Sequence, residues 1–215
     1  MTQNGRFPMR VKPVMLPMAL LAAGVLACSD STGGGGNTRP PGQLNFIRLA
    51  STAPALCADS VGGWATKGSD FELSLEFPET GAGCAGETED FIRLKLDAAS
   101  LAALPNGTPI ADGDSVFISL AWVGSDSILF HLSPTGLTFD PSHAARLKIE
   151  YGEAGDDLDE DGDSDSHDAQ IESELDIWRQ ATPADDFERV GVAKSEDINE
   201  IEADLNGFSR YAIAY

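Results

Sequence analysis

Basic residues are scarce in this chain, and their scarcity excludes the usual partners of basic proteins. Lys and Arg number 14 against 35 Asp and Glu, which gives a formal net charge of −21 at pH 7. Nucleic acids and anionic lipid surfaces attract clusters of positive charge, so neither is an expected partner. A cationic partner, a metal ion or solubility alone explains such an acidic composition better.

A hydrophobic run long enough to cross a bilayer is also missing. The apolar segment near the start runs only from about Val14 to Ala27, whereas a spanning helix needs about 20 residues. Three basic residues and no acidic residue precede this segment. This order predicts that residues 1–27 are a signal peptide, which directs export and is then removed.

The end of the apolar segment resembles the lipobox of bacterial lipoproteins. Residues 25–28 read Val-Leu-Ala-Cys, with an aliphatic residue first, a small residue third and a cysteine last. The resemblance implies cleavage before Cys28 and a lipid anchor on that cysteine. The glycine-rich residues 28–43 are then expected to form a flexible tether. The alternative is an ordinary secretory signal, which predicts export without the anchor.

The resemblance to bacterial lipoproteins also bears on the membrane that receives the anchor. In bacteria with two membranes, an Asp directly after the lipidated cysteine favours retention in the inner membrane. Ser29 occupies that position here. We therefore expect a lipid-anchored protein of the cell envelope, with the outer membrane favoured and the periplasmic or surface side left open.

Cysteine is rare as well, with three residues in the chain. Lipid would occupy Cys28, which leaves Cys57 and Cys84 in an exported protein. Oxidising conditions outside the cytoplasm favour a disulfide between them. Such a bridge would close a loop of about 27 residues and stabilise the fold by roughly 3 to 4 kcal/mol. Two free thiols are the alternative.

Sequence signatures of common catalytic sites are missing too. The chain has no G-x-S-x-G element that would expose a nucleophilic serine. The glycines at 33–36 are not followed by the Lys-Ser or Lys-Thr of a phosphate-binding loop. We therefore expect a non-enzymatic protein, and a hydrolase is the less favoured alternative.

What the sequence does contain is a repeated alternation of apolar and polar residues, which predicts strands with one buried face. Turn residues such as Pro105-Asn106-Gly107 separate the runs. Short strands with frequent turns predict an all-β antiparallel β-sandwich, formed by one domain over residues 44–215. Residues 97–104, rich in Ala and Leu, are expected to form one or two helical turns. The predicted strands cover residues 71–77, 92–96, 116–122, 128–132, 147–151, 175–178, 187–190, 198–205 and 211–213.

Two segments of this domain, residues 130–141 and 204–213, carry a family resemblance. The first contains a corner with proline, glycine, phenylalanine and proline in that order, and the second reads Gly-Phe-Ser-Arg-Tyr-Ala over residues 207–212. Together they resemble the ZU-five domain of ankyrins, netrin receptors and zonula occludens proteins, over about residues 65–215. That family has a histidine where Gly207 stands here.

The residues of the corner also have a physical interpretation of their own. Gly136 is expected to adopt a positive φ, and Phe139 is expected to fill the core. Pro141 is expected to keep the edge of the corner extended. Tyr211 is expected to fill a core layer, with its hydroxyl at the rim.

An acidic insertion at residues 153–170 contains the strongest candidate for a ligand site. From Asp157 the sequence fits D-x-D-x-D-G with an acidic residue at position twelve, the order of a calcium-binding loop. Gly162, at position six, would permit the sharp turn. A single weak Ca²⁺ site is therefore expected. The predicted ligands are Asp157, Asp159, Asp161, Asp163, Asp165 and Asp168.

Three departures separate this loop from a paired EF-hand. Ser164 stands where an apolar residue normally pins the loop, and Asp168 is one methylene shorter than the usual glutamate. No amphipathic helix is expected on either side. The alternative is a solvated acidic loop that serves only solubility.

The function that these observations favour is an interaction or structural module, with an unidentified envelope or extracellular protein as its partner. A carbohydrate-binding module is the first alternative, and it requires exposed aromatic residues among Trp64, Trp122 and Trp178. Self-cleavage at Phe208-Ser209 occurs in some relatives of the ZU-five sandwich. It requires an activating base, which Gly207 cannot supply.

Overall fold

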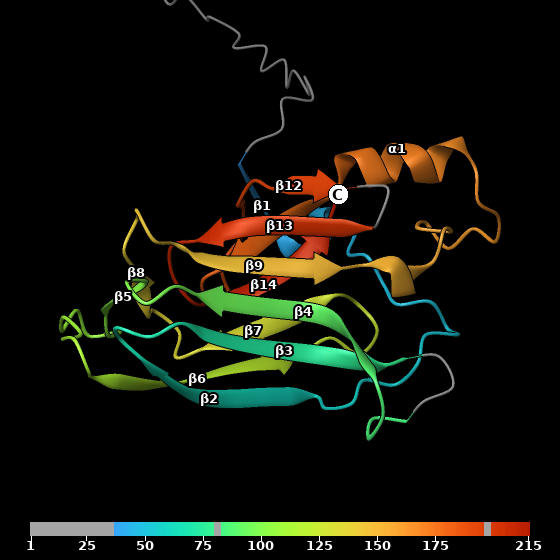
Figure 1. The fold of residues 1–215 in the computed structure, drawn as a ribbon. Helices are drawn as coiled ribbons and strands as arrows, with labels where there is room; N and C mark the ends of the chain where they lie inside the picture. Colours follow the sequence, from blue (N-terminus) through green and yellow to red (C-terminus); the bar gives the residue numbers. More distant parts are fainter. Residues whose placement is uncertain (1–36, 80–82, 196–198) are drawn as a thin grey trace, which may run out of the picture. The chain divides into compact units, whose positions relative to one another are not determined.

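Two antiparallel β-sheets form the body of this protein. The computed structural model describes residues 37–79, 83–195 and 199–215, and Gly36–Tyr215 is one compact unit. In Figure 1 the five-stranded sheet lies in front of the seven-stranded sheet. This arrangement confirms the predicted all-β antiparallel sandwich. Cys28 and the rest of residues 1–36, to which the signal peptide and most of the tether were assigned, lie outside the described residues.

The seven-stranded sheet runs in the order β1-β11-β10-β14-β7-β6-β2. Strands from the two ends of the unit therefore meet in it, because β1 pairs with β11 and β14 pairs with both β10 and β7. Its strands are β1 (Thr38–Arg39), β2 (Ser60–Thr66), β6 (Ser115–Trp122), β7 (Leu129–Ser133), β10 (Asp176–Gln180), β11 (Phe187–Arg189) and β14 (Arg210–Ala214).

The five-stranded sheet runs in the order β12-β13-β9-β4-β3, and a third sheet pairs β5 with β8. One α-helix, α1 (Ser166–Glu174), and two short 3₁₀ helices, Pro41–Gln43 and Gly152–Ala154, complete the described elements. The strands of these two sheets are β3 (Phe71–Pro78), β4 (Thr88–Leu96), β5 (Leu101–Ala103), β8 (Thr138–Phe139), β9 (Ala145–Glu150), β12 (Ala193–Ser195) and β13 (Glu200–Leu205).

The core lies between the two large sheets and is filled by alternate residues of their strands. Leu75 and Ile92 reach it from the five-stranded sheet, and Ile118 and Leu132 reach it from the seven-stranded sheet. All four are fully buried. The alternation of apolar and polar residues in the sequence therefore gave the correct inward faces.

Two predictions about local structure were wrong. Residues 97–104 do not form helical turns: Ser100 donates its backbone N–H to the Asp97 carbonyl in a turn, and β5 follows and pairs with β8. Burial of Leu101 in the core outweighs the weak helical preference of the segment. Residues 38–43, assigned to the tether, form β1 and a 3₁₀ helix, so the folded unit starts before the expected boundary at 44.

The corner before β9 has most of the expected features. Gly136 has a φ of +86°, and Phe139 and Tyr211 are buried. The Tyr211 hydroxyl donates a 2.5 Å hydrogen bond to the carbonyl oxygen of Gly207. Pro141 differs from expectation, since it lies in a turn that His143 N–H and the Asp140 carbonyl close.

The outer face of the seven-stranded sheet is covered on one half only. Leu44 and Phe46, which precede β2 in the chain, pack over β10 and β14 against Trp178 and Ala212. Arg39 adds a cation–π contact to Trp178, with its guanidinium carbon 5.4 Å from the ring centroid. This N-terminal segment does not cover the outward-facing residues of β2 and β6. One of them, Trp64, is 68% exposed.

Candidate functional site

The acidic loop brings three of the six predicted ligands together. Asp157, Asp159 and Asp161 each offer a carboxylate oxygen, and these oxygens lie within 4.8 Å of one another. Gly162 follows with a φ of +100°, as expected for the sharp turn at position six. The arrangement presents three hard oxygen donors to one point, which is the donor type that Ca²⁺ prefers.

Backbone hydrogen bonds hold these carboxylates in place. The two oxygens of Asp157 accept the N–H groups of Asp161 and Gly162 at 3.1 and 3.0 Å. Asp159 Oδ1 accepts the same Asp161 N–H at 3.2 Å. The loop therefore folds around the carboxylates at positions one and three, Asp157 and Asp159, whose oxygens have more lone pairs than these hydrogen bonds use.

The last two predicted ligands have a second role, because they start α1. Asp165 is the N-cap residue of the helix and accepts the His167 N–H at 2.6 Å. Asp168 accepts backbone N–H groups from Asp165 at 2.9 Å and from Leu158 at 2.7 Å. These hydrogen bonds, that from Asp165 first, hold the pKa of Asp168 below its usual value. Asp168 thus ties the start of the loop to the helix.

Like charges accumulate on the exposed side of the loop. The neighbouring carboxylate of Asp161, followed by that of Asp165, raises the pKa of Asp163. His167 Nδ1 lies 2.6 Å from Asp159 Oδ2, and this contact raises the pKa of the imidazole. This imidazole becomes cationic when it is protonated, and the carboxylates left over favour a further positive charge.

A short helix, α1, follows the loop, but it is not the amphipathic helix of a paired EF-hand, since Ile171 is its one buried apolar residue. The capping box of Asp165 and Asp168 starts it, although the residue at N3 is Asp rather than the usual Glu. Ile171 is buried, and Lys194 Nζ donates to the Glu172 carbonyl at 3.0 Å. The sequence signal was present as Asp-x-x-Asp at 165–168, but both residues had been assigned to the ion. No corresponding helix precedes the loop among the described residues.

Cys57 and Cys84 form a disulfide, as predicted, with their Cα atoms 5.3 Å apart. The Cys57 N–H donates to the Glu76 carbonyl on β3 at 2.9 Å, while Cys84 lies in the connection between β3 and β4. The bridge therefore fastens the segment before β2 to the edge of the five-stranded sheet.

The residues around Ser209, where some related sandwiches cleave themselves, do not form a catalytic site in this structure. Ser209 is fully buried, and its hydroxyl has no hydrogen-bond partner of normal geometry. His131 pairs across the strands with Arg210, so its side chain lies on the opposite face of the sheet from Ser209. A Cβ at Gly207 would lie 2.9 Å from the Leu137 carbonyl oxygen, too close for a histidine without a backbone shift.

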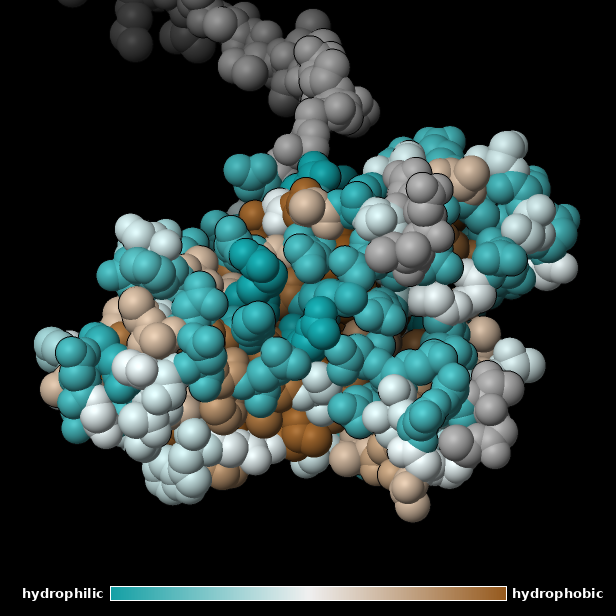
Figure 2. Space-filling model, in the orientation of Figure 1, coloured by the Kyte–Doolittle hydropathy of each residue, from teal (hydrophilic) through white to brown (hydrophobic). Residues whose placement is uncertain are grey.

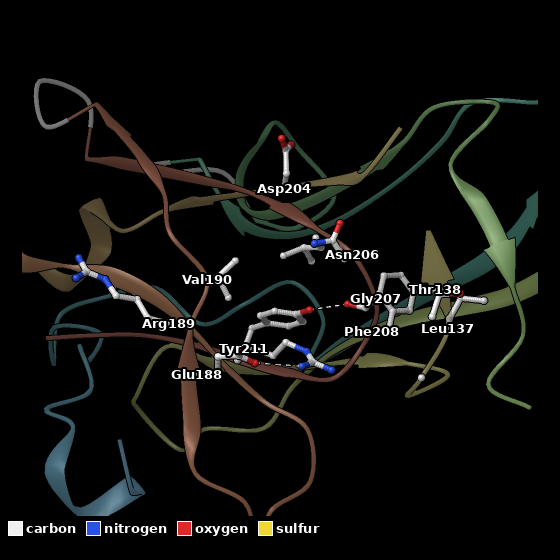
Figure 3. A pocket seen from close by; sticks show the side chains of 13 residues that line it. Leu137, Thr138, Glu188, Arg189, Val190, Asp204, Asn206, Gly207, Phe208 and Tyr211 are labelled. Carbon is white, nitrogen blue, oxygen red and sulfur yellow. Dashed lines mark hydrogen bonds and ion pairs between the residues drawn. The ribbon is translucent and has the colours of Figure 1, made fainter. Parts of the chain in front are cut away.

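A pocket of about 330 Å³ lies beside Tyr211 at one side of the sandwich (Figure 3). Three of its four charged residues take part in ion pairs, and Asp204 is the fourth. Arg179 lies 3.7 Å from the Glu188 carboxylate, and Arg189 pairs with Asp176. Burial raises the pKa of Tyr211. The lining contains neither histidine nor cysteine.

The three tryptophans have different environments. Trp178 is buried under the N-terminal segment, and Trp122 is half-buried against Phe91. Trp64 is exposed and meets Phe117 edge to face, with ring centroids 5.5 Å apart. The sequence analysis did not single out Phe117. Its position was predictable, because the residues on either side of it in β6 point inward and Phe117 must therefore point outward.

The chain matches no family model, no curated protein and no solved structure. Among the described residues, no helix is long and apolar enough to span a membrane.

Proposed function

We propose that this protein is a non-enzymatic lipoprotein of the bacterial cell envelope. Its β-sandwich acts as an interaction or structural module, and its acidic loop binds one calcium ion. The resemblance of residues 25–28 to a lipobox supports a lipid anchor on Cys28, and the disulfide between Cys57 and Cys84 supports an oxidising environment. The ZU-five resemblance remains part of this proposal.

The main support for calcium binding is that the three carboxylates at loop positions one, three and five converge. Asp157, Asp159 and Asp161 would hold the ion, with the backbone carbonyl of Asp163 at position seven. Asp165 and Asp168 support the loop from α1 rather than adding further converging oxygens. A partial ligand set of this kind favours weak binding, in the range of extracellular calcium modules, with Kd about 10⁻⁴ to 10⁻³ M.

Calcium should raise the melting temperature of the folded unit Gly36–Tyr215. At about 10 mM Ca²⁺ the concentration is roughly 10 to 100 times that Kd, which stabilises the native state by about 1.4 to 2.7 kcal/mol. For a domain of this size the shift corresponds to about 3 to 10 °C. Differential scanning calorimetry with calcium and with a chelator measures it.

Two variants with the same charge change make the test specific. Asp161→Asn retains the oxygen that accepts the Asp163 N–H but loses a ligand charge, so it should reduce the calcium shift by more than half. Asp186→Asn, exposed in the turn before β11, should leave the shift unchanged. Identical melting curves for the unmodified chain with calcium and with chelator would refute the site and favour a solvated acidic loop.

The alternative functions differ in their support. The carbohydrate-binding alternative predicted exposed coplanar aromatic residues on one sheet face. Of the three tryptophans only Trp64 is exposed, and the exposed ring beside it, Phe117, is turned 70° from its plane. The hydrolase and self-cleavage alternatives required a base near a nucleophile, and the described geometry places His131 away from Ser209. The exposure of Trp64 and Phe117 on one sheet face nevertheless makes the carbohydrate alternative the one that a specific observation favours.

A further inference from the structure

The outer face of the five-stranded sheet differs sharply in charge from one part of the seven-stranded sheet, the strands β2, β6 and β7. The outward residues of the five-stranded sheet are mostly charged, and Lys148 lies between Glu150 at 2.8 Å and Glu200 at 2.5 Å. Figure 2 shows hydrophilic residues over much of this face, with hydrophobic residues visible between and below them. On the seven-stranded sheet, β2, β6 and β7 contain no Asp, Glu, Lys or Arg at all. In a chain of net charge −21 this uncharged face, the outward side of β2, β6 and β7, is exceptional.

An aromatic pair lies on the uncharged face. Trp64 and Phe117 are cross-strand partners on β2 and β6, and they are 68% and 50% exposed. Gly62 lets the Phe117 ring lie close to the sheet, since a Cβ at that glycine would come within 2.8 Å of the ring. Two large exposed rings on one rigid sheet surface mark a binding site more often than an inert surface.

Small hydroxyl side chains surround this pair. Thr66 and Ser115, one row along the sheet, are hydrogen-bonded to each other at 2.8 Å. Ser119 and Ser133 pair in the row on the other side of Phe117. The surface thus combines apolar rings with neutral donors and acceptors, which complements a ligand that has an apolar ring face and hydroxyl groups around it.

The place of the pair in the sheet argues against the anchoring membrane as its partner. Strand β1, which enters the folded unit, lies at one edge of the seven-stranded sheet, and β2 lies at the other. Six strand spacings of about 4.8 Å separate these edges by roughly 29 Å. A membrane-surface patch would also carry Lys or Arg around its aromatic residues, and these three strands have none.

We propose that the uncharged face binds a neutral polysaccharide, with Trp64, the more exposed ring, packing against the apolar face of a sugar and Phe117, whose plane is turned 70° from it, contacting the edge of that sugar or its neighbour. Ser119 and the neighbouring hydroxyl groups bind the hydroxyls of the sugar. A neutral glycan needs no charged partner, and the lack of charge on these strands fits that ligand. The site lies on a different part of the fold from the acidic loop, so chelation of calcium should leave glycan binding unchanged.

The test is a binding isotherm of Gly36–Tyr215 on cellulose, chitin, xylan and β-glucan, with depletion from solution as the readout. The unmodified unit should bind at least one of the four. Trp64→Ala should weaken that binding at least tenfold, and Phe117→Ala should weaken it as well. Val123→Ala, at a residue 45% exposed just after β6, is the control and should bind normally.

Thermal melts separate loss of binding from loss of folding, because all three substituted side chains are exposed and the melting temperatures should stay within a few degrees. Absence of binding to all four polysaccharides overturns the proposal, as does unchanged binding by Trp64→Ala. Sedimentation supplies the other decisive outcome: a dimer that Trp64→Ala converts to a monomer would show that a second copy, not a glycan, occupies the face.

Discussion

Replacing Phe208 with alanine should lower the free energy of unfolding by about 3 to 5 kcal/mol. Phe208 is fully buried, and its ring meets Phe139 edge to face with centroids 5.0 Å apart. Its backbone N–H donates to the Leu137 carbonyl at 3.0 Å, so the backbone leaves little room for the site to collapse. Since small domains are stable by only about 5 to 15 kcal/mol, the loss is a large part of the total.

Guanidinium unfolding followed by circular dichroism measures this loss, and Phe117→Ala is the matched control. That substitution removes the same atoms from a ring that is 50% exposed, so it should cost less than about 1 kcal/mol. Similar losses for the two variants would contradict the placement of Phe208 in the core and of Phe117 on the surface.

Removing the disulfide should destabilise the folded unit by about 3.5 kcal/mol. Cys57 and Cys84 are 27 residues apart, and freeing a loop of that length restores conformational entropy to the unfolded chain. The double variant Cys57→Ser with Cys84→Ser should therefore melt roughly 7 to 14 °C lower than the oxidised protein. Calorimetry under oxidising conditions measures the difference.

A chemical control accompanies this second prediction. Reduction of the unmodified protein should lower its stability to the level of the double variant, since both treatments open the same loop. A loss below about 1 kcal/mol would mean that the bridge constrains the unfolded chain far less than the loop length implies.

Much of the sandwich was predictable because its strands bury one face. Residues 71–77 alternate strictly, and in residues 116–122 a large apolar residue stands at every second position; the structure places β3 and β6 there within one residue at each end. β2 was missed, since Gly62 and Gly63 interrupt its pattern and Trp64 points outward. Two glycines are poor strand formers, and pairing along the full length of β6 compensates for them.

The residues of the candidate site were predictable from the sequence. Which of them face the ion and which cap the helix was not. Alternate positions from Asp157 to Asp161 follow a loop pattern that sequence alone reveals. That Asp165 and Asp168 also serve as helix caps depends on backbone N–H groups, which appear only once α1 has formed. The uncharged face could not be predicted from the sequence for another reason. Trp64 and Phe117 come together only because β2 and β6 are neighbours in the sheet, and the sequence does not show that pairing.

The central claim of the proposed function is that this protein works outside the cytoplasm on a lipid anchor at Cys28. Intact mass spectrometry of the protein from a bacterial membrane fraction tests it most directly. The account predicts a chain that starts at Cys28 and carries added acyl mass, and a Cys28→Ser variant that loses both the cleavage and the lipid. A membrane-fraction protein that retains residues 1–27, or one cleaved elsewhere without lipid, would contradict the claim.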